Sequence, residues 1–167
     1  MCAASAPGLK CQMIRRYHQA SEMVTLNDVF EFCSLEENVN YQVTYLHPKG
    51  SFHSRMQQAN WRRGLTNAAL HRHCINPPDD ACNLCGLFFV PLFTPFVPGN
   101  MWTASCSYVK NLIPPRDFQR KMDLTVQETF PLRVRGQLRS EMYRWETCDK
   151  YGLGRYSNEH WIGSHPN

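Results

Sequence analysis

The sequence contains no long uninterrupted hydrophobic run. Its most apolar stretch, residues 87–97, is broken by Pro91 and Pro95. That stretch is much shorter than the ~20 apolar residues that a helix needs to cross a bilayer, and the mean hydropathy is −0.48. No segment recurs at a fixed period, which excludes collagen-like, coiled-coil and repeat architectures. We therefore predict no membrane span in this chain.

A dense stripe of basic residues is also lacking. The chain carries 18 Lys and Arg against 14 Asp and Glu, a net charge of +4. The basic residues are scattered, with short clusters at Arg15–Arg16, Arg62–Arg63 and Arg133–Arg135. Because proteins that bind nucleic acid usually gather such charges on one face, we interpret these clusters as solvated surface and predict no nucleic-acid partner.

Several familiar catalytic signatures are missing. The chain has no P-loop, no dinucleotide-binding glycine fingerprint, no His-Glu-x-x-His and no Gly-x-Ser-x-Gly, which argues against the enzyme classes that these motifs define. Residues 1–8 lack the basic and apolar regions of a secretion signal, so we expect them to form a disordered lead-in.

The sequence does have the length and apolar content of one domain, with 167 residues of which 43% are hydrophobic. Hydrophobic spacing and end signals predict helices over residues 9–23, from Thr25 onward, and over 55–71, 108–113 and 116–128, with a last turn capped by Ser157. Strands are expected at 41–46 and 87–93, on either side of a loop at 74–86. The spacing of Leu138, Met142 and Trp145 indicates one more helix. This pattern predicts an α/β fold with few strands and a core containing Tyr45, Leu46, Leu87, Phe88, Phe89, Tyr108, Trp145 and Trp161.

Eight cysteines are present, and some of them lie at a spacing typical of metal sites. His73 and Cys74 precede Cys82-x-x-Cys85, which is the spacing of a zinc knuckle with up to four ligands. The match is partial, because no second Cys-x-x-Cys or His-x-x-x-His completes it. Structural zinc, a disulfide between Cys74 and either Cys82 or Cys85, and free buried thiols all remain open.

A first polar group follows the strand at 41–46. His47 and Lys49 precede Gly50 at the carboxyl end of this strand, where open α/β sheets bind ligands. A lysine ammonium and free backbone N–H groups suit a phosphate. A surface turn with incidental charge is the simpler interpretation of these residues taken alone.

Two later groups could recognise a sugar. Gly99 and Asn100 precede Trp102, which combines a close backbone approach, an amide and a stacking face. Glu159, followed by His160 and Trp161, could supply a general base. Taken singly, these groups are explained more simply as a tight turn with a core tryptophan and as a surface carboxylate.

The order of the three groups is more informative than any one of them. Tyr45-Leu-His-Pro-Lys-Gly50, Gly99-Asn-Met-Trp102 and Arg155-Tyr-x-x-Glu-His-Trp161 resemble the motifs of glycosyltransferase-like proteins, over about three-quarters of the chain. The resemblance implies transfer of a sugar from a nucleotide-diphospho-sugar to a hydroxyl of a glycan or protein acceptor. It implies a small, incomplete GT-A-like (Rossmann-like) sheet with flanking helices and one domain over residues 9–167, located in the lumen of the Golgi or endoplasmic reticulum.

By this resemblance, site roles fall on the residues of the three motifs. Diphosphate binding falls on His47, Lys49 and Gly50, and the catalytic base is Glu159. The sugar or acceptor pocket is lined by Gly99, Asn100, Trp102, His160 and Trp161.

One departure from the resembled family concerns its metal. GT-A enzymes usually hold Mn²⁺ or Mg²⁺ with an Asp-x-Asp motif that neutralises the leaving diphosphate, and this sequence has none. Either the chain is a partial protein that lacks its N-terminal nucleotide-binding half, or it is a divergent relative, whose activity the sequence leaves open. The alternative function is a small zinc-binding or disulfide-stabilised interaction module without catalysis.

Overall fold

The computed structural model describes residues 13, 15–48, 56–79, 81–91, 95–129 and 157–165. Lys49, Gly50 and Trp145 lie outside these residues, as do the expected lead-in and the helix around Met142. In chain order the elements are α1 (Glu22–Ser34), the 3-10 helix η2 (Glu36–Asn38), β1 (Gln42–Tyr45), α2 (Met56–Ala69), α3 (Arg72–Ile75), β2 (Leu84–Gly86), β3 (Val90–Pro91), β4 (Pro95–Phe96), β5 (Trp102–Ser105), α4 (Cys106–Val109), α5 (Pro115–Thr129) and α7 (Asn158–Trp161).

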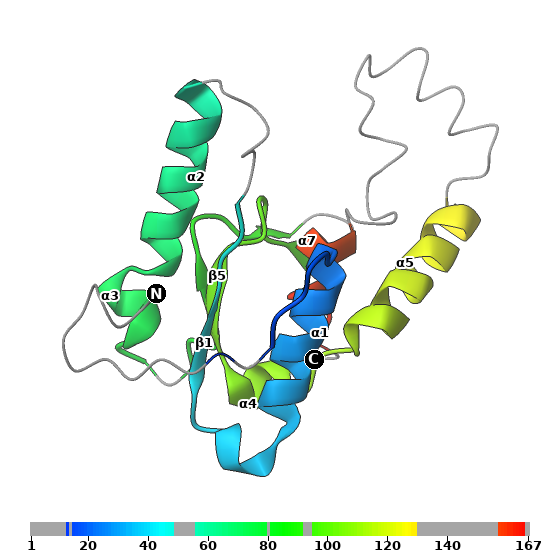
Figure 1. Cartoon of the computed structure of the whole chain (residues 1–167), viewed down its shortest axis with the longest axis horizontal. Coiled ribbons are helices and arrows are strands. Elements are labelled where there is room, and N and C mark those ends of the chain that lie inside the picture. Colours follow the sequence, from blue (N-terminus) through cyan, green and yellow to red (C-terminus); the bar gives the residue numbers. More distant parts are fainter. Residues whose placement is uncertain are drawn as a thin grey trace.

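A three-stranded sheet lies at the centre, in the order β1-β5-β2, and both outer strands run antiparallel to β5. Helix α2 stands on one side of this sheet, and α1, α5 and α7 lie on the other (Figure 1). β3 and β4 form a separate two-stranded ladder. The fold is therefore mixed α/β with helices flanking a small antiparallel sheet.

The two faces of β5 serve two hydrophobic cores, because side chains alternate along a strand. Trp102 and Ala104 enter the main core, which contains Leu26, Cys33, Tyr45, Val97, Trp102, Ala104, Cys106, Val109, Leu112, Phe118, Met122, Trp161 and Ile162. On the other face, Thr103 Oγ1 donates to the carbonyl of Ala69 in α2 at 2.6 Å. Met101, just before β5, joins Leu65 and Ala69 in the small core.

Most of the predicted elements are confirmed, with shifted ends. The strand at 41–46 is β1, the helices at 55–71 and 116–128 are α2 and α5, and the last turn is α7. The helix at 108–113 begins earlier, at Cys106, because Ser105 Oγ accepts from the backbone N–H of Tyr108 and caps it. The expected strand at 87–93 is displaced, since β2 ends at Gly86 and β3 begins at Val90. The predicted loop at 74–86 was wrong where it contains β2.

The predicted helix over residues 9–23 is wrong over residues 15–21 and correct only at its last two residues. Residues 15–20 are not helical, and α1 begins at Glu22 after Ser21. Arg15 instead pairs with Asp28 and Glu31 of α1, with N···O distances of 3.0 and 2.9 Å. The expected helix start at Thr25 is likewise one turn late.

The core prediction is correct in part. Tyr45 and Trp161 are buried, and Tyr108 and Leu87 pack against the two cores. Leu46 is exposed, because it follows Tyr45 and so points to the opposite side of the chain. Phe88 and Phe89 are also exposed, since they lie between β2 and β3, where the chain has left the sheet.

Candidate functional site

The first two motifs meet at the carboxyl end of β1. His47 follows β1, and its Nε2 lies 2.8 Å from the carbonyl oxygen of Gly99, 52 residues later in the chain. A carbonyl oxygen only accepts, so Nε2 is the protonated ring nitrogen and donates this bond. The contact fixes the imidazole against the turn that leads into β5.

This turn needs the residues that the sequence places in it. Gly99 and Asn100 have φ of 84° and 47°, in the left-handed region that glycine and asparagine tolerate best. A Cβ on Gly99 would lie 2.5 Å from Cδ1 of Leu65 in α2. Gly99 therefore allows both the backbone conformation and the close approach to α2.

The side chain of Asn100 is fully buried and joins two neighbours. Its Nδ2 donates to Oε1 of Glu22 at 2.8 Å, and its Oδ1 accepts from Nε1 of Trp102 at 2.8 Å. Both ends of the amide thus have a partner, as a buried amide requires. Asn100 therefore links the Glu22 carboxylate to Trp102 of the main core.

Glu22 is the site residue that sequence reasoning missed. It is the first residue of α1, where a carboxylate is stabilised by the positive end of the helix dipole. Its Oε1 lies 3.6 Å from Nε2 of His47. The sequence signal was the Ser21-Glu22 helix start, which the prediction of one helix over 9–23 concealed.

Tyr45 connects this polar group to the core. Burial raises the pKa of Tyr45, and the Glu22 carboxylate raises it further through its charge and a hydrogen bond. The Tyr45 ring stacks on His47 and on Trp102, with centroid distances of 5.8 and 5.4 Å. Tyr45 therefore remains a neutral phenol beside the carboxylate.

Trp102 is fully buried between aromatic neighbours, with the ring of Trp161 6.1 Å away on another element. Together with the fully buried Asn100, it offers no face to a ligand. By contrast, the side chains of His47 and Glu22 are 19% and 23% exposed. We call Glu22 and His47, with Gly99 and Asn100 behind them, the Glu22–His47 site.

The third motif reaches this region through its aromatic residue. Trp161 contacts Trp102 and donates from Nε1 to the carbonyl of Ile113 at 2.8 Å. The carbonyl of Glu159 accepts from the backbone N–H of Val97 at 3.0 Å. His160 is buried, with its ring 4.8 Å from that of Phe96. These contacts dock α7 on the segment that leads into the Gly99 turn.

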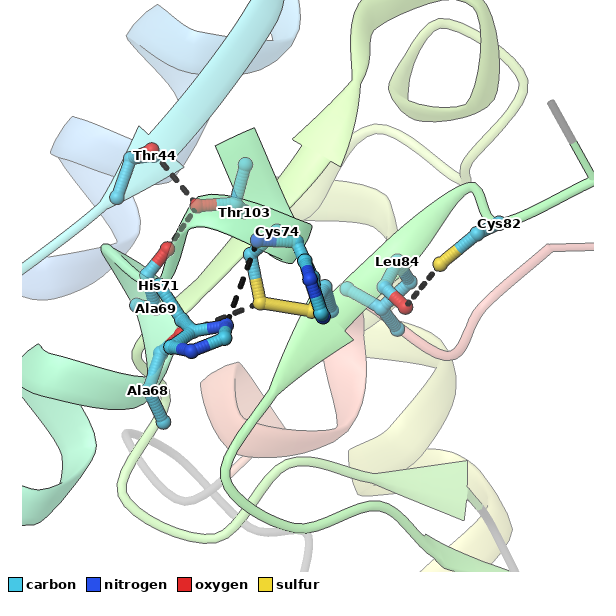
Figure 2. Close-up of a disulfide and its surroundings, with 10 residues drawn as sticks. Thr44, Ala68, Ala69, His71, Cys74, Cys82, Leu84 and Thr103 are labelled. Atoms are coloured by element: carbon cyan, nitrogen blue, oxygen red, sulfur yellow. Dashed lines mark hydrogen bonds between the residues drawn. A yellow bond between two sulfur atoms is a disulfide. The ribbon is translucent and has the colours of Figure 1, made fainter. Parts of the chain in front are cut away.

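The cysteines form two disulfides within the described residues, Cys33–Cys106 and Cys74–Cys85. Figure 2 shows the second disulfide. Cys82 lies just before β2, and its side chain points toward the carbonyl of Leu84. Cys82 is exposed and free, and the ring of His73 packs on that of His71. A disulfide sulfur is not the thiolate that zinc binds, and no three His, Cys, Asp or Glu side chains of the described residues could hold a metal ion.

Taken together, the described residues define a mixed α/β fold with two disulfides among them and a carboxylate–imidazole pair at a strand end. The chain belongs to the family described as a domain of unknown function (DUF8361), whose model matches residues 1–167. No curated protein and no solved structure matches the chain. Within the part of the chain that the structure describes, no helix has the length and hydrophobicity to span a membrane.

Proposed function

We propose that this protein is a glycosyltransferase-like domain that transfers a sugar from a nucleotide-diphospho-sugar to an acceptor hydroxyl. The supporting observation is the hydrogen bond between His47 Nε2 and the Gly99 carbonyl. It joins two of the three motifs on which the resemblance rests. The Glu22 carboxylate beside it adds a group suited to binding or deprotonating a hydroxyl.

In this proposal the exposed and the buried residues have different roles. Lys49 and Gly50 follow His47 in sequence and meet the donor diphosphate. Asn100 and Trp102 act as positioning residues that hold Glu22 and His47, because both are fully buried. Two carboxylates, Glu22 and Glu159, are candidates for the base.

The transfer needs no reactant besides the nucleotide-sugar and the acceptor hydroxyl. The acceptor oxygen forms a bond to the anomeric carbon as the bond from that carbon to the diphosphate oxygen breaks. The acceptor proton passes to the carboxylate, and the nucleoside diphosphate leaves with the bonding electron pair. The described residues do not fit a divalent metal centre, so we assign no step to a metal ion. Lys49, two residues after His47, is the cation nearest in sequence to the site.

The proposal also extends to the fold, as an incomplete GT-A-like domain. A Rossmann-like sheet binds its nucleotide on parallel strands, whereas β1, β5 and β2 pair antiparallel. We therefore assign this sheet to a part of a GT-A-like domain other than its nucleotide-binding half. The disulfides support a lumenal location, since such bonds persist in oxidising compartments.

Donor binding tests this function. UDP-glucose, UDP-galactose, UDP-N-acetylglucosamine, GDP-mannose and GDP-fucose would be titrated by calorimetry against wild-type protein and His47→Ala. We expect at least one donor to bind, and His47→Ala to weaken it about tenfold or more, since the hydrogen bond that holds the end of β1 against the Gly99 turn is lost. His71→Ala is the matched control, because His71 is exposed and outside the site. Binding of no donor, or equal binding by His47→Ala, would contradict the assignment.

Carboxylate variants then identify the base. Glu22→Gln keeps an oxygen to accept from Asn100 Nδ2 but cannot take up a proton. With a donor that binds, the rate of sugar transfer to an acceptor, or to water, is expected to fall about 10²-fold or more in whichever of Glu22→Gln and Glu159→Gln removes the base. Unchanged rates in both variants would show that neither carboxylate has this role.

One observation favours an interaction module without catalysis. Phe88 and Phe89 are 51% and 54% exposed, next to the segment that the Cys74–Cys85 disulfide holds. Exposed aromatic residues of this kind are enriched at protein interfaces. The absence of any donor binding in the titration above would leave this as the better interpretation.

A further inference from the structure

A groove of about 580 Å³ lies between α1 and the outer edge of β1. This volume is within the range of about 300–1,000 Å³ that small-molecule sites occupy. One wall is formed by Thr25, Val29 and Phe32 of α1, and the other by β1 residues and Tyr41. Within the described residues β1 pairs with β5 alone, so this edge of the sheet is open to a ligand.

The groove is lined by residues of α1 and β1 that lie next in these elements to Glu22 and Tyr45. Glu22, Thr25, Val29 and Phe32 are spaced three and four residues apart, which places them along one face of α1. Thr44 lines the groove one residue before Tyr45, whose ring contacts His47. A chain molecule in the groove therefore has one end near the Glu22 carboxylate.

The charges around the groove are paired with each other. Arg15 binds Asp28 and Glu31 with N···O distances of 3.0 and 2.9 Å, and Tyr17 donates to Asp28 at 3.1 Å. Among the described residues that line the groove, Arg15 is the one cation and Asp28 the one carboxylate, and the two pair with each other. The groove suits a neutral ligand.

The remaining lining combines aromatic rings with polar side chains. Tyr41 and Tyr17 are 56% and 44% exposed, and Tyr41 meets Phe32 edge to face, with centroids 5.7 Å apart. Gln42 and Thr25 add an amide and a hydroxyl. Aromatic rings accept the C–H face of a sugar, and amides and hydroxyls bond its edge, so this lining has the chemistry of a carbohydrate site.

We propose that the groove binds a neutral oligosaccharide, with Tyr41 as its main stacking platform. Its role as the acceptor site rests on the proposed glycosyl transfer, whereas oligosaccharide binding does not. Occupied in this way, the groove presents the terminal hydroxyl of a glycan to the Glu22–His47 site.

Binding of maltopentaose, cellopentaose, laminaripentaose and mannopentaose would be measured by NMR titration without any nucleotide-sugar. At least one pentasaccharide is expected to bind and to shift the backbone amides of Gln42, Val43 and Thr44. Tyr41→Ala should weaken that binding about tenfold. Phe89→Ala is the matched control, because Phe89 is exposed to a similar degree but lies outside the groove.

Other outcomes overturn the inference. The inference fails if none of the four glycans binds, or if Tyr41→Ala binds them as tightly as wild type. It also fails if the protein binds a polygalacturonate oligomer more tightly than the neutral glycans. Finally, it fails if the groove amides shift with an extended Thr-Val repeat peptide but with none of the glycans. Binding of the nucleotide-sugar donor is measured in a separate titration with wild-type protein and His47→Ala. If no donor binds but a glycan does, only the glycosyl transfer is rejected. Loss of glycan binding with intact donor binding would reject only the groove.

Discussion

The two faces of the central sheet are stabilised to different degrees. On the α1 face, a large core surrounds the Cys33–Cys106 disulfide, whose two residues are fully buried and 73 positions apart in sequence. On the α2 face, the buried hydrophobic cluster of the described residues consists of Leu65, Ala69 and Met101, and the Cys74–Cys85 disulfide spans 11 positions. The α1 face therefore carries most of the burial and the longer covalent loop.

The candidate site lies where the two faces join. Gly99 packs on Leu65 of the small core, whereas Asn100 and Trp102 belong to the α1 side. The Gly99 turn thus connects a strongly held region with a weakly held one. The position of His47 relative to Glu22 depends on both, through the Gly99 carbonyl and the Asn100 amide.

Removing each disulfide tests this difference most directly. The stability lost on removing a disulfide increases with the length of the loop that the disulfide closes. The double variant Cys33→Ala with Cys106→Ala is therefore expected to lower the free energy of unfolding by about 4 kcal/mol, and Cys74→Ala with Cys85→Ala by about 3 kcal/mol. Urea unfolding of the oxidised proteins measures both values. Cys82→Ala is the control and should stay within about 0.5 kcal/mol of wild type, because Cys82 is free and exposed. A larger loss from the α2-face pair would refute the ranking.

Glycine substitutions examine the junction itself. Gly99→Ala places a Cβ 2.5 Å from Leu65 Cδ1 at a φ of 84°, so we expect a loss of about 1–3 kcal/mol in the free energy of unfolding. Gly64→Ala lies inside α2, where its Cβ would make an ordinary 3.6 Å contact with Leu87. That variant should gain about 0.5–1 kcal/mol. Thermal denaturation distinguishes the two, and equal effects would show that the turn carries no special constraint.

Leu65→Ala separates the causes of the Gly99→Ala loss. If steric contact with Leu65 dominates, the double variant loses less stability than the sum of the single variants. If backbone conformation dominates, the two losses add. Additivity would place the constraint in the turn alone and remove the small core's influence on the site.

Local sequence patterns predicted the elements whose signals are short-range. The alternation and aromatic content at 41–46 gave β1, and Pro115 gave the start of α5. Buried and exposed residues were harder to separate, as Tyr45 and Leu46 show, because register depends on the partner strand.

The site was predictable only in its backbone motifs. The Gly99 turn followed from its own residues, but Glu22 lies 78 residues from its partner Asn100. No local pattern links such distant residues. The choice of Cys85 over Cys82 as the partner of Cys74 likewise depends on where β2 runs beside α3.

The smallest expected effect concerns the ionisation of Tyr45 on the α1 face. Burial, and then the charge and hydrogen bond of Glu22, raise the pKa of Tyr45 above its ordinary value. The folded protein therefore holds this proton more tightly than the unfolded chain does, and its stabilising contribution is full below about pH 10 and is lost as the pH rises further. The loss approaches about 1.4 kcal/mol per pH unit.

Tyr45→Phe should make the stability of the protein decline less steeply above about pH 10, as measured by urea unfolding at several pH values. Burial also raises the pKa of Tyr108, whose hydroxyl donates to the carbonyl of Ile162, so Tyr108→Phe should flatten the same decline by a smaller amount. Glu22→Gln alone keeps the Tyr45 phenol and removes the carboxylate charge, so the difference between its decline and that of wild type gives the contribution of the carboxylate. A decline as steep in Tyr45→Phe as in wild type would mean that Tyr45 is not enclosed beside Glu22, and the link between the α1 face and the site would have to be abandoned.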